Sequence, residues 1–135
     1  RNWGRKGVII FSDGDDQNSQ TTREKALARV QASDAMLYPV GFGAGATVPG
    51  LRSNLETYAR ATGGRAFFPR NPKELDDVFE HIVTELAHQY VLSYAPTNPT
   101  SDGGWRDIKV QVRSGKYDIR ARRGYRATGP QHAAR

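Results

Sequence analysis

Carboxylates and a hydroxyl group follow a short apolar run early in the sequence. Residues 7–11 read Gly-Val-Ile-Ile-Phe, and Ser12, Asp13, Asp15 and Asp16 come directly after them. Oxygen atoms of such side chains are the ligands that Mg²⁺ takes in proteins, whereas Asp-Gly is also a common turn sequence. The stretch therefore indicates either a solvated turn or part of a metal site with Asp13 as the ligand.

The position of Asp13 after the apolar run adds weight to the metal interpretation for a complete site in a longer chain, whereas for this chain alone the turn is the favoured interpretation. The run has the pattern of a strand buried on both faces, and ligands of open α/β sheets bind beyond the carboxyl ends of the strands. Magnesium takes about six oxygen ligands and usually keeps several waters beside one or two carboxylates. We therefore expect Asp13 at an exposed strand end and only weak binding of Mg²⁺, or of another divalent cation, by this chain. The surrounding partner-binding or outer residues are predicted to be Ser12, Asp15 and Asp16.

Strand-like apolar runs alternate with helical stripes over most of the chain. Asn71 followed by Pro72 and Glu74 is a strong helix-start signal, and Gly63-Gly64 provides a left-handed stop. Three strand-helix units in succession predict an α/β fold, with a three-layer, open and mostly parallel sheet that has helices on both faces. The predicted strands are 7–11, 36–40 and 65–68, and the predicted helices are 22–33, 51–62 and 72–89.

After residue 90 the pattern changes to that of antiparallel strands. Residues 91–94 read as a strand, and residues 108–112 and 117–121 alternate apolar and polar side chains around a Ser-Gly turn. We therefore expect a C-terminal antiparallel β-hairpin. The predicted organisation is 1–95 as an α/β unit, 96–126 as a loop and basic hairpin of the same domain, and 127–135 as a flexible tail.

Positive charge is concentrated in this hairpin. Residues 105–126 hold eight Lys or Arg against two Asp, a surplus that equals the net charge of +6. This composition suits a nucleic-acid surface, but alternation also puts charge on the wet face of any hairpin. The wet face is the favoured interpretation, and a nucleic-acid-binding module is the alternative. The basic surface would be formed by Arg106, Lys109, Arg113, Lys116, Arg120, Arg122 and Arg123.

Several other chemistries lack the residues that they require. The chain has no cysteine, which removes thiol catalysis and zinc-thiolate sites. His81, Glu85 and His88 share a helical face, but they have no partner segment for a metal site and read as a solvated face. No set of serine, histidine and acid offers a nucleophile, and no apolar run approaches the roughly 20 residues of a membrane helix. We expect neither an enzyme nor a membrane span.

Taken together, these motifs resemble the later half of a von Willebrand factor A (VWA) domain. The features that match are Ser12-Asp13-Gly14 after a strand, a capped helix, a strand ending in Gly-Phe-Gly, a helix ending in Thr62-Gly63-Gly64, then Phe-Phe-Pro and a long helix. The run from Thr62 through Gln89-Tyr90-Val91-Leu92-Ser93-Tyr94 to Arg123-Gly124-Tyr125 is similar to a bacterial VWFA-related family.

The resemblance implies a protein-interaction or adhesion module. In VWA domains a metal-ion-dependent adhesion site combines a D-x-S-x-S loop, a threonine loop and an aspartate, and its metal binds an acidic group of a protein partner. Asp13 matches the aspartate, and nothing in the sequence matches the two loops. We therefore expect the C-terminal portion of a longer parent, secreted or periplasmic. Its first strand should be an exposed edge that promotes self-association.

Overall fold

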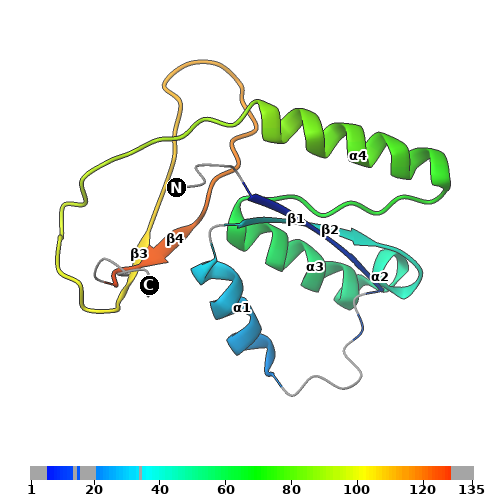
Figure 1. The fold of residues 1–135 in the computed structure, drawn as a ribbon, viewed down its shortest axis with the longest axis horizontal. Coiled ribbons are helices and arrows are strands. Elements are labelled where there is room, and N and C mark those ends of the chain that lie inside the picture. Colours follow the sequence, from blue (N-terminus) through cyan, green and yellow to red (C-terminus); the bar gives the residue numbers. More distant parts are fainter. Residues whose placement is uncertain (1–5, 14, 16–20, 34, 129–135) are drawn as a thin grey trace, which may run out of the picture.

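The computed structural model describes residues 6–13, 15, 21–33 and 35–128. Helices and strands are mixed along the chain, which confirms the predicted α/β class (Figure 1). The helices are α1 (Arg23–Ala32), α2 (Ala44–Thr47), α3 (Pro49–Thr62) and α4 (Pro72–Ala87), and the strands are β1 (Lys6–Ser12), β2 (Ala35–Gly41), β3 (Trp105–Asp107) and β4 (Gly124–Arg126).

The first two strands form a parallel pair that is connected through α1 (Figure 1). Their register runs from Lys6 opposite Ala35 to Ser12 opposite Gly41. Parallel neighbours need a crossover connection, which is usually a helix, and α1 provides it. The two predicted strands and the helix between them are confirmed.

Helix boundaries lie at capping residues, and those at Asn71 and Gly63 are the predicted ones. The side chain of Thr22 accepts a hydrogen bond of 3.4 Å from the N–H of Lys25 at the start of α1. The side chain of Asn71 likewise accepts one of 2.9 Å from the N–H of Glu74 at the start of α4. Gly63 ends α3 in the left-handed region, with φ of +80°. Glycine adopts this conformation without steric strain because it has no Cβ.

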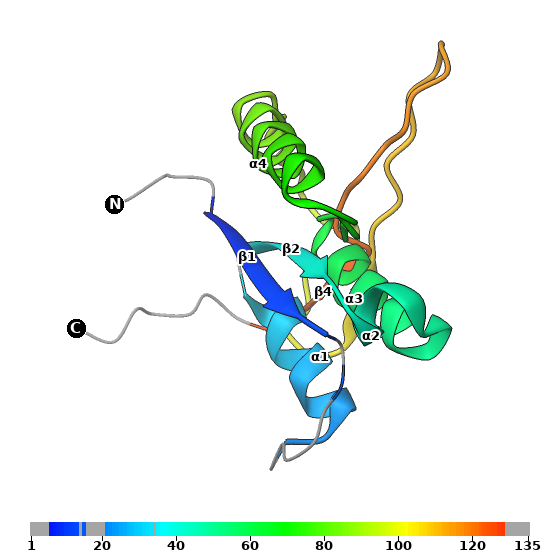
Figure 2. The same cartoon turned by 90° about the vertical axis from the view of Figure 1, so that its right-hand side faces the viewer.

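The second strand is the buried centre of the fold. Tyr38 and Val40 are 0% and 1% exposed and pack with Val78 and Ile82 of α4. Because side chains alternate along a strand, the intervening residues of β2 face the other way, towards α3 and its contacts with β2. Figure 2 accordingly shows α4 and α3 on opposite sides of the β1–β2 pair.

The sheet is narrower than the sequence predicts. The expected third strand at 65–68 reduces to a single parallel bridge between Val40 and Phe67, in which the N–H of Phe67 donates to the carbonyl of Pro39 at 2.8 Å. Pro69 follows closely and has no N–H to continue a ladder. The predicted three-layer sheet is therefore corrected, over the described residues, to a two-stranded parallel pair with one added bridge.

The C-terminal hairpin is displaced from its predicted position. β3 and β4 pair in antiparallel register with Trp105 opposite Arg126, whereas the predicted strands at 108–112 and 117–121 are irregular. Tyr117 is 67% exposed. Alternation stabilises a strand only where one face packs against something, and an isolated two-stranded ribbon is marginal in water. Most residues of the two arms are exposed in the structure, so their alternation gains little packing and does not produce strands.

Residues 91–94, which also read as a strand, are irregular and exposed in the structure. Leu92, for example, is 72% exposed. An apolar run forms a strand when a neighbouring edge satisfies its backbone groups, and the described chain gives this run no strand partner. The predicted strand is wrong for this structure.

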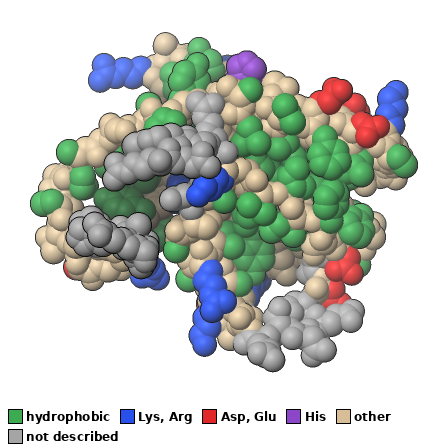
Figure 3. All heavy atoms as spheres, in the orientation of Figure 1, with side chains coloured by type: hydrophobic (Ala, Val, Ile, Leu, Met, Phe, Trp, Pro, Cys, Tyr) green, Lys and Arg blue, Asp and Glu red, His purple; other side chains and the backbone are tan. Residues whose placement is uncertain are grey.

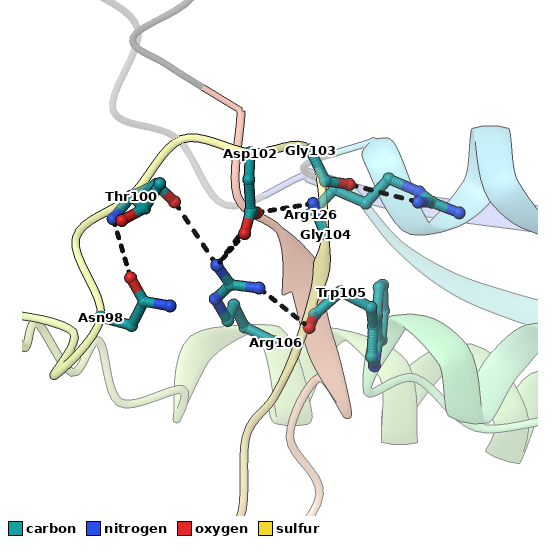
Figure 4. A network of polar contacts seen from close by, with 8 residues as sticks. All are labelled: Asn98, Thr100, Asp102, Gly103, Gly104, Trp105, Arg106 and Arg126. Atoms are coloured by element: carbon teal, nitrogen blue, oxygen red, sulfur yellow. Dashed lines mark hydrogen bonds and ion pairs between the residues drawn. The ribbon is translucent and has the colours of Figure 1, made fainter.

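A cluster of polar contacts holds the base of the β3–β4 hairpin (Figure 4). The carboxylate of Asp102 accepts hydrogen bonds from the N–H of Gly104 at 2.8 Å and from Arg106, whose Nη2 lies 2.9 Å from each oxygen. Hydrogen bonds from Arg106 and Gly104 lower the pKa of Asp102. Arg126 donates to the carbonyl of Gly103 at 3.4 Å. The hairpin therefore has a polar anchor at its base.

The first strand has an open edge, as predicted. It pairs with β2 on one side, and no described strand pairs with its other side. Val8, Ile10 and Phe11 are 42%, 39% and 50% exposed. Figure 3 shows apolar side chains gathered on the face of the molecule where Figure 1 draws β1. An exposed apolar edge of this kind is a template for pairing with another chain.

Candidate functional site

Asp13 lies immediately beyond β1, at the carboxyl end of the parallel pair, and it is exposed as predicted. The N–H of Phe42, which follows β2, donates to the carbonyl of Ser12 at 3.3 Å, so the two strand ends stay joined here. A Cβ added to Gly45 of α2 would overlap the backbone of Asp13. Glycine at that position thus lets α2 pack directly against the turn that carries Asp13.

The carboxylate of Asp13 also shapes its own turn. The N–H of Asp15 donates to Oδ1 of Asp13 at 3.2 Å, which is the contact that makes aspartate common in turns. Asp16 and Gly14 lie outside the described residues. This contact fits the turn interpretation of Asp13, and its role as a metal ligand stays a prediction.

The described residues do not by themselves form a complete metal site. No group of three or more His, Asp or Glu side chains gathers among them. The described carboxylates that follow β1 are those of Asp13 and Asp15, which is fewer than the roughly six oxygen ligands that Mg²⁺ takes. The predicted roles of Ser12, Asp15 and Asp16 around Asp13 therefore depend on oxygen donors beyond the described residues.

Internal contacts divide the predicted basic surface. Besides Arg106 at the hairpin base, Arg120 forms an ion pair of 2.6 Å with Glu85, and Arg122 donates to the backbone carbonyl of Ser33. These three arginines serve the fold, which weakens the nucleic-acid alternative. The exposed members of the predicted surface are Lys109, Arg113, Lys116 and Arg123.

Glu85 is the centre of a partly buried polar network that joins α4, β2 and the C-terminal segment. The hydroxyl of Tyr38 donates to Oε1 of Glu85 at 3.0 Å, while Arg120 pairs with Oε2. The Nε2 atom of His81 lies 3.7 Å from that same Oε2. Burial, and after it the neighbouring Glu85 carboxylate, raises the pKa of Tyr38 to about 12. The network ties the last part of the chain to the core.

The sequence pattern did not predict this network. The helical spacing of Glu85, His81 and His88 predicts a solvated face, which is wrong for Glu85 because its side chain is only 13% exposed. The Nδ1 atom of His88 lies 2.7 Å from a backbone carbonyl of its own helix. One signal was available, since a buried tyrosine hydroxyl usually finds a partner and Tyr38 stands in an apolar strand. Sequence spacing does not identify Arg120 as a member.

Two shallow hollows meet at Arg65 and Ala66, which line both of them. The first, of about 460 Å³, lies between the end of α3 and the segment 118–123. The second, of about 530 Å³, lies between the Phe67-Phe68 segment and α4. The sequence patterns gave no reason to bring these segments together.

The likeness of this chain to known proteins is limited. No family model matches it, and no curated protein matches it. The chain is similar to a solved structure, the crystal structure of an uncharacterized membrane-spanning protein from Vibrio fischeri, with 27% identity and a TM-score of 0.51. The match covers 62% of this chain and 48% of that chain, which is about half of the Vibrio fischeri chain. Within the described residues here, no helix is long and apolar enough to cross a bilayer. The likeness relates part of the two folds and assigns no activity.

Proposed function

We propose that this chain is the later portion of a VWA-type protein-interaction module. In the complete parent, a divalent metal would bind an acidic group of a protein partner. The observation that carries the proposal is the position of Asp13, an exposed carboxylate beyond a parallel strand, packed beside α2 at Gly45. In open α/β sheets this is the end at which ligands bind.

The chemistry of the proposed site is binding without catalysis. A hard divalent cation supplies a positive charge that attracts a carboxylate, and it keeps several waters as ligands. The task of Asp13 is to present one carboxylate at a fixed place, held by β1 and by the contact with Gly45. The remaining oxygen donors are proposed to come from the opening half of the parent, which would carry the D-x-S-x-S and threonine loops.

Replacement of Asp13 by alanine tests this proposal through calorimetric titration with MgCl₂. In the present chain we expect weak Mg²⁺ binding that Asp13→Ala changes little, because too few oxygen donors converge to offset the dehydration of the ion. In a longer form that includes an upstream D-x-S-x-S segment, we expect Mg²⁺-dependent binding that Asp13→Ala abolishes. The matched control is Asp76→Ala, at an exposed position on α4, which should leave binding unchanged.

Two results would contradict the half-site proposal. Tight Mg²⁺ binding by the present chain, lost in Asp13→Ala, would show that a whole site exists here. The coding sequence upstream of Arg1 gives the second check, since the absence of any D-x-S-x-S within roughly 120 residues, the usual size of a domain, would leave a scaffold without a metal site.

The resemblance also leads us to propose an extracytoplasmic location for the parent. The Vibrio fischeri protein is described as membrane spanning, which fits an interaction module held near a membrane. Fractionation of cells that express the tagged parent would test the location, and a purely cytoplasmic signal would contradict it.

A nucleic-acid-binding module is the alternative function. It would use the exposed side chains of Lys109, Arg113 and Lys116 on the C-terminal arms. Phosphate contacts make affinity fall steeply with added salt, so a salt series with a single-stranded oligonucleotide discriminates the two functions. No measurable binding at low salt would remove the alternative.

A further inference from the structure

The two hollows that meet at Arg65 form one surface rich in guanidinium groups. Carboxylates are interspersed among them, with Glu56 and Asp118 in the first hollow and Asp77 in the second. Positive charge is in excess over the whole surface. We call its arginines the Arg65 band, which consists of Arg52, Arg60, Arg65, Arg70, Arg120 and Arg123.

Two members of the Arg65 band have no carboxylate partner among the described residues, namely Arg65 and Arg123. The Nη1 atom of Arg65 lies 3.5 Å from Nε2 of His81, and Arg123 is exposed. Arg52 and Arg60 both pair with Glu56, at 3.3 and 3.7 Å. Exposed pairs of this kind contribute little to stability. Arg60 and Arg123 can therefore turn to an incoming anion at small cost, whereas Arg52 and Arg65 also lie against aromatic rings.

Arg120 lines the first hollow and carries unsatisfied hydrogen-bond donors. Its Nη2 atom pairs with Glu85, but its Nε and Nη1 atoms are buried and have no hydrogen-bond partner among the described residues. A buried donor without an acceptor is costly. Because each of these nitrogens has almost no exposed surface, an anion in the hollow would contact them only after the Arg120 side chain moved, and the proposed contacts therefore fall to the exposed arginines.

The second hollow combines guanidinium groups with aromatic rings. The guanidinium carbon of Arg52 lies 3.9 Å from the centre of the Phe68 ring, and that of Arg65 lies 5.9 Å from the centre of the Phe67 ring. Such stacking holds a guanidinium in place by cation–π attraction and leaves its N–H groups to bind anions. It also covers ring faces on which nucleic-acid bases would otherwise stack.

We propose that the Arg65 band binds an acidic segment of a protein partner, with Asp or Glu carboxylates on Arg65 and Arg123 and small apolar side chains against Ala66, which lines both hollows. The interspersed carboxylates Glu56 and Asp77 would repel a continuous phosphate chain, whereas a peptide can place its charges between them. The site includes neither a metal nor Asp13, so it goes beyond the function proposed above.

Fluorescence anisotropy of the chain at low salt, with three labelled probes, tests the proposal. The probes are a short glutamate-rich peptide, the same peptide with glutamine for glutamate, and a single-stranded oligodeoxynucleotide of similar length. We expect the glutamate peptide to bind, the glutamine peptide to bind at least about tenfold more weakly, and EDTA to have no effect. Failure of the glutamate peptide to bind, or tighter binding of the oligodeoxynucleotide, would overturn the proposal.

Paired variants then locate the site. Arg65→Gln with Arg123→Gln should weaken binding of the glutamate peptide by about ten- to a hundredfold, because each lost charge-assisted hydrogen bond costs about tenfold. Arg113→Gln with Lys116→Gln makes the same change in net charge at exposed positions outside both hollows, and should have little effect. Equal loss of binding in both pairs of variants would show a general charge effect and overturn the proposal.

Far-UV circular dichroism checks that all variants are folded. Asp13→Ala should not alter this binding, so the two proposals fail independently.

Discussion

Removal of the Tyr38 hydroxyl tests the network around Glu85. Tyr38→Phe keeps the ring, which is 0% exposed, and deletes the hydroxyl that donates to Glu85 at 3.0 Å. A hydrogen bond to a charged group contributes about 1.5 to 3 kcal/mol. Because Arg120 still pairs with the carboxylate, we expect a loss near the lower end, about 2 kcal/mol, in the free energy of unfolding at neutral pH.

The effect of Tyr38→Phe should depend on pH in a defined direction. The pKa of Tyr38 is raised from 10.0 to about 12 in the folded chain, so the folded state holds this proton more tightly than the unfolded state. The associated stability is fully present below pH 10 and is lost as the pH rises through the folded value. The linkage relation gives this proton a total contribution of about 2.7 kcal/mol to the free energy of unfolding. About 1.4 kcal/mol of that contribution is lost by about pH 11.

Urea unfolding followed by far-UV circular dichroism measures both effects. The difference in unfolding free energy between the wild type and Tyr38→Phe should narrow by about 1.4 kcal/mol between about pH 9 and about pH 11. The control is Tyr117→Phe, at a residue that is 67% exposed, which should change stability by less than about 0.5 kcal/mol at either pH. If the difference in unfolding free energy between the wild type and Tyr38→Phe stayed constant from about pH 9 to about pH 11, then burial and Glu85 would not raise the pKa of the Tyr38 hydroxyl as inferred.

Two further predictions concern the carboxyl end of the sheet and its open edge. Gly45→Ala should destabilise the chain by about 1 to 3 kcal/mol in urea unfolding, because its Cβ would overlap the backbone of Asp13. Gly50→Ala, where a Cβ meets nothing within 4 Å, is the control, and equal stability of the two variants would disprove the contact. The chain should self-associate at high concentration through β1, and Ile10→Lys should reduce this in sedimentation velocity. A monomer at all concentrations would contradict that prediction.

The features that could be predicted from the sequence depend on neighbouring residues. Asn71 and Glu74 specify the start of α4 within one helical turn, and Gly63 specifies the end of α3. The apolar runs of β1 and β2 predict strands even when the segments that pair with them are not known. The exposed position of Asp13 follows from those strands, since it comes directly after the first of them.

The features that could not be predicted depend on segments that are distant in the sequence. The predicted strand at 65–68 has suitable residues, but Pro69 limits its pairing to one bridge. The alternation at 108–112 and 117–121 indicated a hairpin, yet strand formation there requires a covering layer, which spacing cannot reveal. The ion pair between Glu85 and Arg120 likewise joins a helix to an irregular segment, and no local pattern connects them.

The far edge of β2 is closed in a way that limits the size of any assembly built on this sheet. The N–H of Leu37 donates to the hydroxyl of Thr62 at 2.9 Å, Pro39 has no N–H, and the N–H of Gly41 donates to the carbonyl of Phe67 at 2.8 Å. On that side, β2 therefore has no row of free N–H donors to which an additional strand could pair. Two copies that pair through β1 would each use the open edge of this sheet. Such a two-fold contact leaves no open β1 edge for a third copy. The β1–β2 sheet thus favours discrete dimers over filaments that grow without limit.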